Sequence, residues 1–228
     1  GFGARNDVFI DGVRDPGVLN RDTFNIESVE VAKGPASTIS GRGSTGGAIN
    51  LVTKMADGGD SGDFRVTGGT PGYARTTADI DTTFGETGGF RLNAVWTDAG
   101  IPGRDVAHNR NAGIAPSLAL GLGTPTRVYA NLSHLEQDNI PDYGLPATLP
   151  DNMPPGQTIE DLDWNNFYGL KARDQETIRS DQAGIIVEHD FEGGAQLRNT
   201  TRYGRNLRDT VVTPPRAASI DNGLNDPG

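Results

Sequence analysis

The residues that could carry chemistry in this sequence begin with a glycine-rich stretch. Gly41 to Gly46 reads GRGSTG and matches the G-x-G-x-x-G fingerprint of dinucleotide-binding folds. That site needs a strand before the glycines and a helix after them, so that amide N–H groups at the helix start can face a pyrophosphate. The stretch that follows, Ala48 to Val52, favours a strand over a helix. We therefore expect a structural glycine turn here and no nucleotide site.

Side chains that could act in catalysis or metal binding are scattered. The three histidines, His108, His134 and His189, have no recognisable ligand spacing, and the sequence contains no cysteine. Ser40 and Ser44 lie in the glycine-rich stretch but outside a G-x-S-x-G context. We expect no enzymatic activity, no cofactor and no intrinsic metal site.

Two pairs of carboxylates are spaced two residues apart. Asp79 and Asp81 share one face of a predicted strand, and Asp161 and Asp163 lie in an acidic loop. Paired carboxylates can serve as acid and base. Without a further group to complete a site, solvation by water is the ordinary explanation for both pairs.

Composition limits the class of protein. The 228 residues carry a formal net charge of −10, and all of the acidic excess lies after residue 55, which argues against nucleic acid as a partner. No run of about 18 apolar residues predicts a membrane-spanning helix. Because the chain opens on Gly1 without a methionine and closes on Gly228 within a predicted loop, we expect a fragment of a longer protein.

Residues 29–54 predict a strand, a glycine turn and a second strand, around which the chain is organised. Val29 to Val31 alternates apolar and charged residues, and Ala48 to Val52 resumes the β-rich composition. Glycines between them allow positive φ, which we predict at Gly43 or Gly46. An earlier strand is predicted at Val8 to Ile10, followed by an Asp-Gly turn.

Farther along the chain, apolar residues recur at every second position, as in the run from Phe90 to Trp96. We expect about seven strands in this part of the chain. Most are placed near residues 78–84, 90–96, 111–120, 127–136, 181–191 and 195–206. Such alternation fits a half-buried soluble sheet as well as a membrane barrel.

The predicted connections favour the barrel. Residues 85–89, 121–126 and 192–194 predict short turns, whereas 97–109, 137–180 and the tail after residue 206 predict long loops. Short turns at one side and long loops at the other are typical of outer-membrane barrels, whose strands need about 9–11 residues to cross. An aromatic girdle is predicted beside the short turns, from Phe84, Phe90, Tyr129 and Phe191. A polar, lumen-facing set is predicted as well, from Gln182, Glu188, Asp190, Arg198 and Arg202.

Several motifs resemble a known family. VEVAKGP at residues 29–35 and SGRGSTGGAINLVTK at residues 40–54 resemble the end of the plug domain of TonB-dependent outer-membrane receptors. FIDGVR at residues 9–14 and NRDTFNIE at residues 20–27 are similar to the plug of the catecholate siderophore receptor branch. IPGRD, GIAPSL, DNIPDYG and NTTRYGRN, farther along, are similar to the first barrel hairpins of that branch.

The resemblance implies an all-β transmembrane antiparallel β-barrel, present as a fragment of about seven strands, with part of an α+β plug domain. Residues 1–55 would be the C-terminal part of the plug domain, and residues 56–62 a linker. Residues 63–228 would be the N-terminal part of the outer-membrane β-barrel.

The resemblance also implies a function. The whole receptor would import a ferric siderophore, of the catecholate type, across the outer membrane of a Gram-negative bacterium, with outer-membrane lipid around the barrel. The TonB-ExbB-ExbD complex would supply energy through an N-terminal segment that we expect to lie outside this chain. Iron would arrive inside the chelate, so no metal ligand or cofactor is implied. The alternatives are a receptor of this architecture for another cargo, such as cobalamin or an oligosaccharide, and a passive porin or adhesin.

Two groups of site residues come from the same resemblance. Plug loops facing the external vestibule would contact the ligand, because arginines there gain charge-assisted hydrogen bonds to an anionic ferric catecholate. These ligand-binding residues are Arg5, Asn6, Arg14, Asn20 and Arg21. Arg14 and Arg21 could instead pair with Asp15 and Asp22. A polar network between plug and barrel is expected at Glu30, Lys33 and Arg42.

Overall fold

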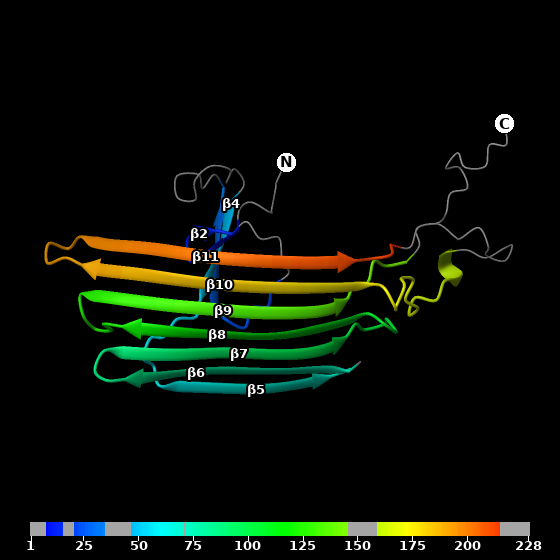
Figure 1. The fold of residues 1–228 in the computed structure, drawn as a ribbon, viewed down its shortest axis with the longest axis horizontal. Coiled ribbons are helices and arrows are strands. Elements are labelled where there is room, and N and C mark those ends of the chain that lie inside the picture. The colour runs from blue at the N-terminus through cyan, green and yellow to red at the C-terminus, as the bar shows by residue number, and fades with distance from the viewer. Residues whose placement is uncertain (1–7, 16–20, 35–46, 71, 146–158, 215–228) are drawn as a thin grey trace.

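The structure is a computed structural model that describes residues 8–15, 21–34, 47–70, 72–145 and 159–214. Within these residues the backbone forms two β-sheets, one of seven strands and one of four (Figure 1). No helix in this part of the chain has the length and apolar character to cross a membrane.

The seven strands of the large sheet follow one another in chain order, and each pairs antiparallel with the next. The strands are β5 (Ser61–Gly69), β6 (Tyr73–Phe84), β7 (Gly88–Gly100), β8 (His108–Leu120), β9 (Thr126–Ile140), β10 (Gln175–Asp190) and β11 (Gln196–Val211). Period-two alternation places one set of side chains on each face, as the sequence predicts. The expected seven-stranded antiparallel sheet is therefore confirmed.

The longest strands exceed their predicted bounds. β9, β10 and β11 have 15, 16 and 16 residues. The predicted segments 127–136, 181–191 and 195–206 are therefore too short at one end. The added residues include Asp138, Thr177 and Asp209, which are opposite one another in the register. In the added stretches apolar residues do not recur at every second position, and pairing with neighbouring strands keeps their backbone extended.

Connections differ between the two ends of the large sheet. One end, here called the turn end, has short turns at residues 85–87, 121–125 and 191–195. The other, here called the loop end, has connections at residues 70–72, 101–107 and 141–174, the last containing the 3-10 helix η1 (Ile159–Asp161). The predicted asymmetry is confirmed, except that the first connection at the loop end is short.

The small sheet has the order β2-β1-β4-β3, from β1 (Val8–Ile10), β2 (Val13–Arg14), β3 (Ile26–Lys33) and β4 (Gly47–Thr53). β1 lies parallel to β4, and the other pairs are antiparallel. Asp11 and Gly12, with φ of 51° and 80°, form the predicted turn between β1 and β2. The described residues of this part contain no α-helix, so the helical portion of the expected α+β plug is not seen in them.

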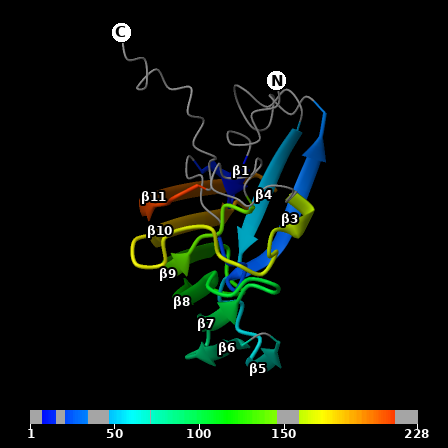
Figure 2. The ribbon, with the colours of Figure 1, turned by 90° about the vertical axis from the view of Figure 1, so that its right-hand side faces the viewer.

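The small sheet lies against one face of the large sheet, and β3 and β4 cross the direction of its strands (Figures 1 and 2). An apolar contact joins the two parts: Phe24, just before β3, packs with Val95, Ala115 and Leu135 of the large sheet. Gly113 leaves room for this ring, because a Cβ there would lie 3.0 Å from two of its atoms. Phe24 therefore anchors the start of β3 on the large sheet.

The two faces of the large sheet have opposite character. The inner face, toward the small sheet, buries polar groups such as Asn93, whereas Trp96 on the outward face is half exposed. Phe84 and Phe191 are exposed beside the turn end, as an aromatic girdle requires. Tyr129 is opposite Ala119 and Ile186 in the register and lines an inner cavity. Its predicted place in the girdle is therefore wrong, because alternation along β9 turns it inward.

Candidate functional site at the interface of the two sheets

Charged and polar side chains line the inner face of the large sheet. The register places Gln182 opposite Gly204, Glu188 opposite Arg198 and Asp190 opposite Gln196, all in one face of β10 and β11. Arg202 lies on the same face and its side chain reaches Asp11 of the small sheet, at 3.7 Å. The predicted lumen-facing set is thus on the face that receives the small sheet.

Asp22 forms the densest of the contacts between the two sheets. Its carboxylate accepts two hydrogen bonds from the Arg75 guanidinium of β6, at 2.6 and 2.8 Å, and one from the Asn111 amide of β8, at 3.0 Å. The Phe24 backbone N–H donates a further bond at 2.9 Å. Arg75 also donates to the Thr97 hydroxyl, at 2.8 Å. The Asp22 side chain is only 7% exposed, so its charge depends on these donors.

A second cluster joins the end of β4 to β6 and β7. Lys54 donates to Asp79 at 2.9 Å, and Arg91 forks onto the same carboxylate with two bonds of 2.9 Å. Arg91 also lies 3.3 Å from Glu27 of β3. Asp81, on the same face, is 3% exposed. Solvation by water is therefore the wrong explanation for Asp79 and Asp81, because both carboxylates face the interface and bind partners there.

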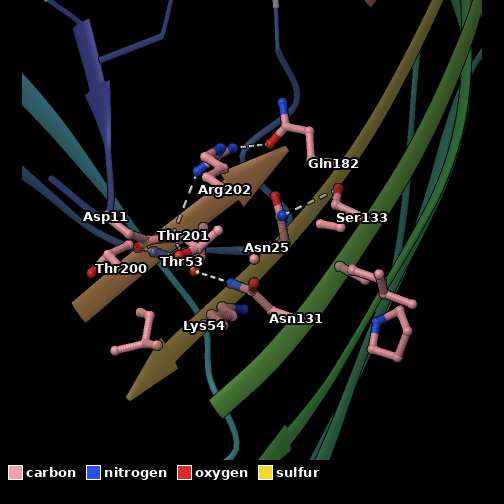
Figure 3. Close-up of a pocket in the computed structure, with 16 residues that line it drawn as sticks. Asp11, Asn25, Thr53, Lys54, Asn131, Ser133, Gln182, Thr200, Thr201 and Arg202 are labelled. Atoms are coloured by element: carbon pink, nitrogen blue, oxygen red, sulfur yellow. Dashed lines mark hydrogen bonds and ion pairs between the residues drawn. The ribbon is translucent and has the colours of Figure 1, made fainter. Parts of the chain in front are cut away.

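The third cluster surrounds a small cavity between β4 and the strands β9 to β11 (Figure 3). Asp11 accepts hydrogen bonds from the Thr53 backbone N–H at 2.8 Å and the Thr53 hydroxyl at 2.9 Å. The Asn131 amide donates to that hydroxyl at 3.3 Å, and Arg202 donates to Gln182. The cavity has a volume of about 30 Å³, which suits a water molecule among polar groups.

Backbone N–H groups after β4 are held by inner-face side chains. Ala56 donates to the Ser117 hydroxyl at 3.1 Å, and Asp57 and Gly58 donate to Asp81 at 3.1 and 3.3 Å. β5 then begins at Ser61, within the last residues of the predicted linker. The division into residues 1–55, 56–62 and 63–228 stays a prediction.

The predicted ligand-binding residues fall into three situations. Arg5, Asn6 and Asn20 lie outside the described residues. Arg14 is exposed on β2, with its guanidinium 5.4 Å from the centre of the Phe9 ring.

Arg21 is mostly buried and lies 2.6 Å from Asp15, and burial lowers the pKa of its guanidinium. The alternative that Arg21 pairs with an aspartate of its own loop therefore holds. Asp22, the other aspartate in that alternative, pairs instead with Arg75 of the large sheet.

Two of the three predicted network residues, Glu30 and Lys33, lie in the described part of the chain. Glu30 accepts a hydrogen bond of 2.8 Å from the Asn50 amide and, with Arg198 and Glu188 of the large sheet, lines a cavity of about 790 Å³. Lys33 is exposed at the end of β3, and Arg42 lies outside the described residues. Their joint role as a network stays a prediction.

Polar contacts dominate this interface, and their character determines how easily the two sheets could separate. Hydrogen bonds and ion pairs to a detached sheet can be replaced by water, whereas a large apolar seal would resist separation. Within the described ranges, no group of three or more His, Asp or Glu side chains could hold a metal ion. The geometry is that of a small sheet held against a curved wall mainly by polar contacts.

A separate contact organises the loop end. Arg104, in the connection between β7 and β8, donates to both carboxylate oxygens of Asp142, one of them at 2.8 Å. It also donates to the backbone carbonyl of Trp164, at 2.6 Å. These hydrogen bonds hold the pKa of the Asp142 carboxyl below its ordinary value. Arg104 therefore ties the 141–174 connection to the 101–107 connection.

Arg104→Ala is expected to release the 141–174 connection. Losing charged hydrogen bonds should cost roughly 2 kcal/mol, or about 30-fold in the local exchange rate. Hydrogen exchange of peptides covering residues 159–174 in the whole receptor measures the change. Lys171→Ala, at an exposed position of the same loop, is the matched control. Equal exchange in the two variants would remove Arg104 from this role.

Comparison with known proteins agrees with this arrangement. Residues 1–48 match the family described as TonB-dependent Receptor Plug Domain. A probable TonB-dependent receptor of Bordetella pertussis, BfrD, is 40% identical over 97% of this chain and 30% of its own length. The catecholate siderophore receptor Fiu of Escherichia coli K12 is 38% identical over 93% of this chain and 29% of its own. The chain thus spans less than a third of these relatives.

Solved structures extend the likeness to the fold. The closed form of the ferric-catecholate import receptor Fiu from Escherichia coli matches with a TM-score of 0.83 and 36% identity, over 91% of this chain and 30% of that one. The siderophore receptor PiuA from Acinetobacter baumannii matches with a TM-score of 0.80 and 34% identity, over the same shares. The chain therefore belongs to the TonB-dependent receptors, with the small sheet as part of the plug and the large sheet as the first strands of the barrel wall.

Proposed function

We propose that the receptor containing this chain imports a ferric siderophore, of the catecholate type, across the outer membrane of a Gram-negative bacterium. The iron chelate is the cargo and lands on the plug from the loop end. Energy comes from the TonB-ExbB-ExbD complex acting on the plug. Outer-membrane lipid surrounds the outward face of the wall.

The observation that carries the proposal is the polar docking of the plug on the inner face. A plug fixed at Asp22, Asp79 and Asp11 fills the space beside these strands, which argues against a passive porin. The docking contacts are hydrogen bonds and ion pairs, so a pulling force can exchange them for water one cluster at a time. Two relatives with the names of siderophore receptors support the cargo class.

Uptake of radioactive iron by cells producing the whole receptor tests the proposal. We expect uptake from a ferric catecholate that stops when TonB is deleted or the membrane potential is collapsed. Uptake without TonB would point to a passive pore. If the receptor takes up or binds only cobalamin or an oligosaccharide, the proposed cargo is wrong and the proposed TonB-dependent mechanism stands.

Arg14→Ala is expected to weaken binding of the ferric catecholate about 10-fold, because an exposed guanidinium can form charged hydrogen bonds to an anionic chelate. Arg14→Lys keeps the charge and loses the planar fork of the guanidinium, so its dissociation constant should lie between those of the wild type and Arg14→Ala. Fluorescence titration of the purified receptor gives the dissociation constants. Arg21→Ala serves as a contrast, because its guanidinium is already paired with Asp15. An unchanged constant in folded Arg14→Ala would refute the assignment.

A further inference from the structure

A short segment between the two sheets binds the wall through its backbone. Residues 56–60, here called the anchor segment, follow β4 and lead to the start of β5 at the turn end (Figure 1). Its first residue, Ala56, is 0% exposed. Just before it, the carbonyl of Met55 accepts a hydrogen bond of 3.2 Å from the Arg91 guanidinium. The chain between the two sheets is therefore docked on the wall.

Three consecutive backbone N–H groups of the anchor segment donate to buried side chains of the wall. Ala56 donates to the Ser117 hydroxyl, and Asp57 and Gly58 donate to the Asp81 carboxylate. Both acceptors are buried, at 2% exposure for Ser117 and 3% for Asp81. A buried acceptor that loses its donors is left unsatisfied, so release of the segment is costly.

Backbone angles show that the anchor segment is held in one conformation. Gly58 has φ of 75°, and Asp60 has φ of 42°, a value that residues other than glycine rarely adopt. The Asp60 carboxylate accepts hydrogen bonds from the Thr83 backbone N–H at 2.7 Å and from the Thr83 hydroxyl at 2.9 Å. A strained angle persists only where its surroundings fix it. Both ends of the segment are therefore bound to the wall.

The wall also has a slot that fits this segment. A Cβ at Gly89 of β7 would lie 3.4 Å from the Ala56 Cβ and from the Gly58 nitrogen, so glycine lets the segment lie directly on the strand. Leu122, in the turn after β8, covers the same place, because its Cδ1 would lie 3.0 Å from that Cβ. The slot is formed by β6, β7 and β8, each of which has a neighbouring strand on both sides.

The plug is attached to the wall in a different way. The backbone hydrogen bonds of β1 to β4 run between these four strands. The plug meets the wall mainly through side chains, such as Asp22 with Arg75. It can therefore move off the wall with its sheet intact, whereas the anchor segment cannot leave without breaking backbone hydrogen bonds to the wall.

We propose that the anchor segment stays on the wall while the plug is pulled, so that movement of the plug ends at Met55. The inference rests on the proposed function, because it requires a plug that an energised complex moves. In that function the loop end faces outward, so the anchor segment lies at the end from which the pull comes. A fixed end prevents complete withdrawal of the plug and guides it back to the same place on the wall.

Two disulfide locks, in a whole receptor that carries no other cysteine, separate movement of the plug from movement of the anchor segment. Ala56→Cys with Gly89→Cys locks the anchor segment, because its two Cβ atoms would lie 3.4 Å apart, close to the spacing in a disulfide. Asn25→Cys with Ser133→Cys locks the plug, where the native side chains lie 3.5 Å apart. We expect iron uptake to fall at least about tenfold in the oxidised plug lock and to change less than about twofold in the oxidised anchor lock.

The reduced form of each variant is its own control for folding. Equal loss of uptake in the two oxidised locks would overturn the proposal, because the anchor segment would then have to leave the wall. Full uptake in the oxidised plug lock would overturn it as well, because the plug would then not move off the wall near Asn25.

Hydrogen exchange of the purified whole receptor in increasing urea tests the same point without transport. We expect residues 21–33 to lose protection at a urea concentration at which residues 56–60 keep it. Asp81→Ala should speed exchange of residues 56–60 at least about tenfold. Thr82→Ala, at the exposed neighbouring position, should leave it unchanged. Should Asp81→Ala not fold, Asp81→Asn replaces it, with a smaller effect in the same direction because one acceptor oxygen remains.

Loss of protection at the same urea concentration in both segments would overturn the proposal, whatever the cargo. A receptor that keeps residues 56–60 protected but takes up no ferric catecholate would overturn the transport proposal alone. One that takes up the chelate but releases both segments together would overturn this proposal alone.

Discussion

Arg75→Ala is expected to weaken docking of the plug on the wall by roughly 3–5 kcal/mol, because it leaves the buried Asp22 carboxylate without its two charged hydrogen bonds. Asn111 and the Phe24 N–H remain as donors, and neither carries a charge. The effect should appear as faster hydrogen exchange in peptides covering residues 21–33 of the whole receptor. Most wall strands should exchange as before, since their ladders do not depend on Asp22.

Arg65→Ala is the control for this substitution. Arg65 stands on the inner face of β5, pairs with Asp63 of its own strand at 3.0 Å and is 74% exposed. Its loss should change docking by less than about 1 kcal/mol. A double variant, Arg75→Ala with Asp22→Asn, should recover part of the lost stability, because it removes the unpaired charge as well. Equal effects from Arg65→Ala and Arg75→Ala would contradict this account of the interface.

The same cluster predicts how docking depends on pH. Burial alone would raise the pKa of the Asp22 carboxyl, but the hydrogen bonds from Arg75, Phe24 and Asn111 bring it below the ordinary value. A carboxyl whose pKa is lowered by docking stabilises the docked form above its ordinary pKa, and this contribution is lost as the pH falls through the lowered value. Docking should therefore weaken only in acid below about pH 4. In Arg75→Ala acid should no longer weaken docking, because protonation then removes an unpaired buried charge.

How far the sequence predicts this fold depends on the surroundings that each side chain faces. An outward side chain such as Trp96 faces an apolar medium, and Asn93, three positions earlier on the same strand, faces the plug, so alternation identifies the strand without further information. Asp138 and Thr177 are exposed polar residues near the ends of their strands. No alternation of apolar and polar residues marks where these strands end. The ends of β9 to β11 come from pairing with neighbouring strands, which a single sequence does not display.

The interface is predicted less well than the strands. The sequence identifies Arg202 as a lumen-facing cation, because charge is costly on the lipid side. It does not indicate that Asp11, 191 residues earlier, is the partner, since that pairing depends on how the small sheet crosses the wall. Asp79 shows the same limit: its spacing with Asp81 is visible, and its ion pairs with Lys54 and Arg91 are not.

The glycine turn is also predicted only in part. A high density of glycine between β3 and β4 predicts positive φ somewhere in the stretch. Gly43 and Gly46, the predicted positions, lie outside the described residues, and Gly47 has φ of 139°. A Cβ at Gly47 would also be pressed against the carbonyl oxygen of Ala32 on β3. Conformational freedom and close approach of another strand therefore both require glycine at this one position.

Gly47→Ala is expected to destabilise the β3–β4 pair by roughly 3 kcal/mol or more, because it combines an unfavourable φ with a clash against backbone that a side chain cannot relieve. Gly34→Ala is the matched control: Gly34 has φ of 88° and open space where a Cβ would stand. It should therefore cost only about 1–2 kcal/mol, the strain of the backbone angle alone.

Hydrogen exchange of residues 26–33 and 47–53 in the whole receptor compares the two variants. Loss of protection in Gly47→Ala should spread along both strands, since Gly47 pairs with Lys33 at the start of their ladder. In Gly34→Ala it should stay near the end of β3. If the two alanines cost the same, close packing against Ala32 is not what requires glycine, and positive φ alone is sufficient to explain it.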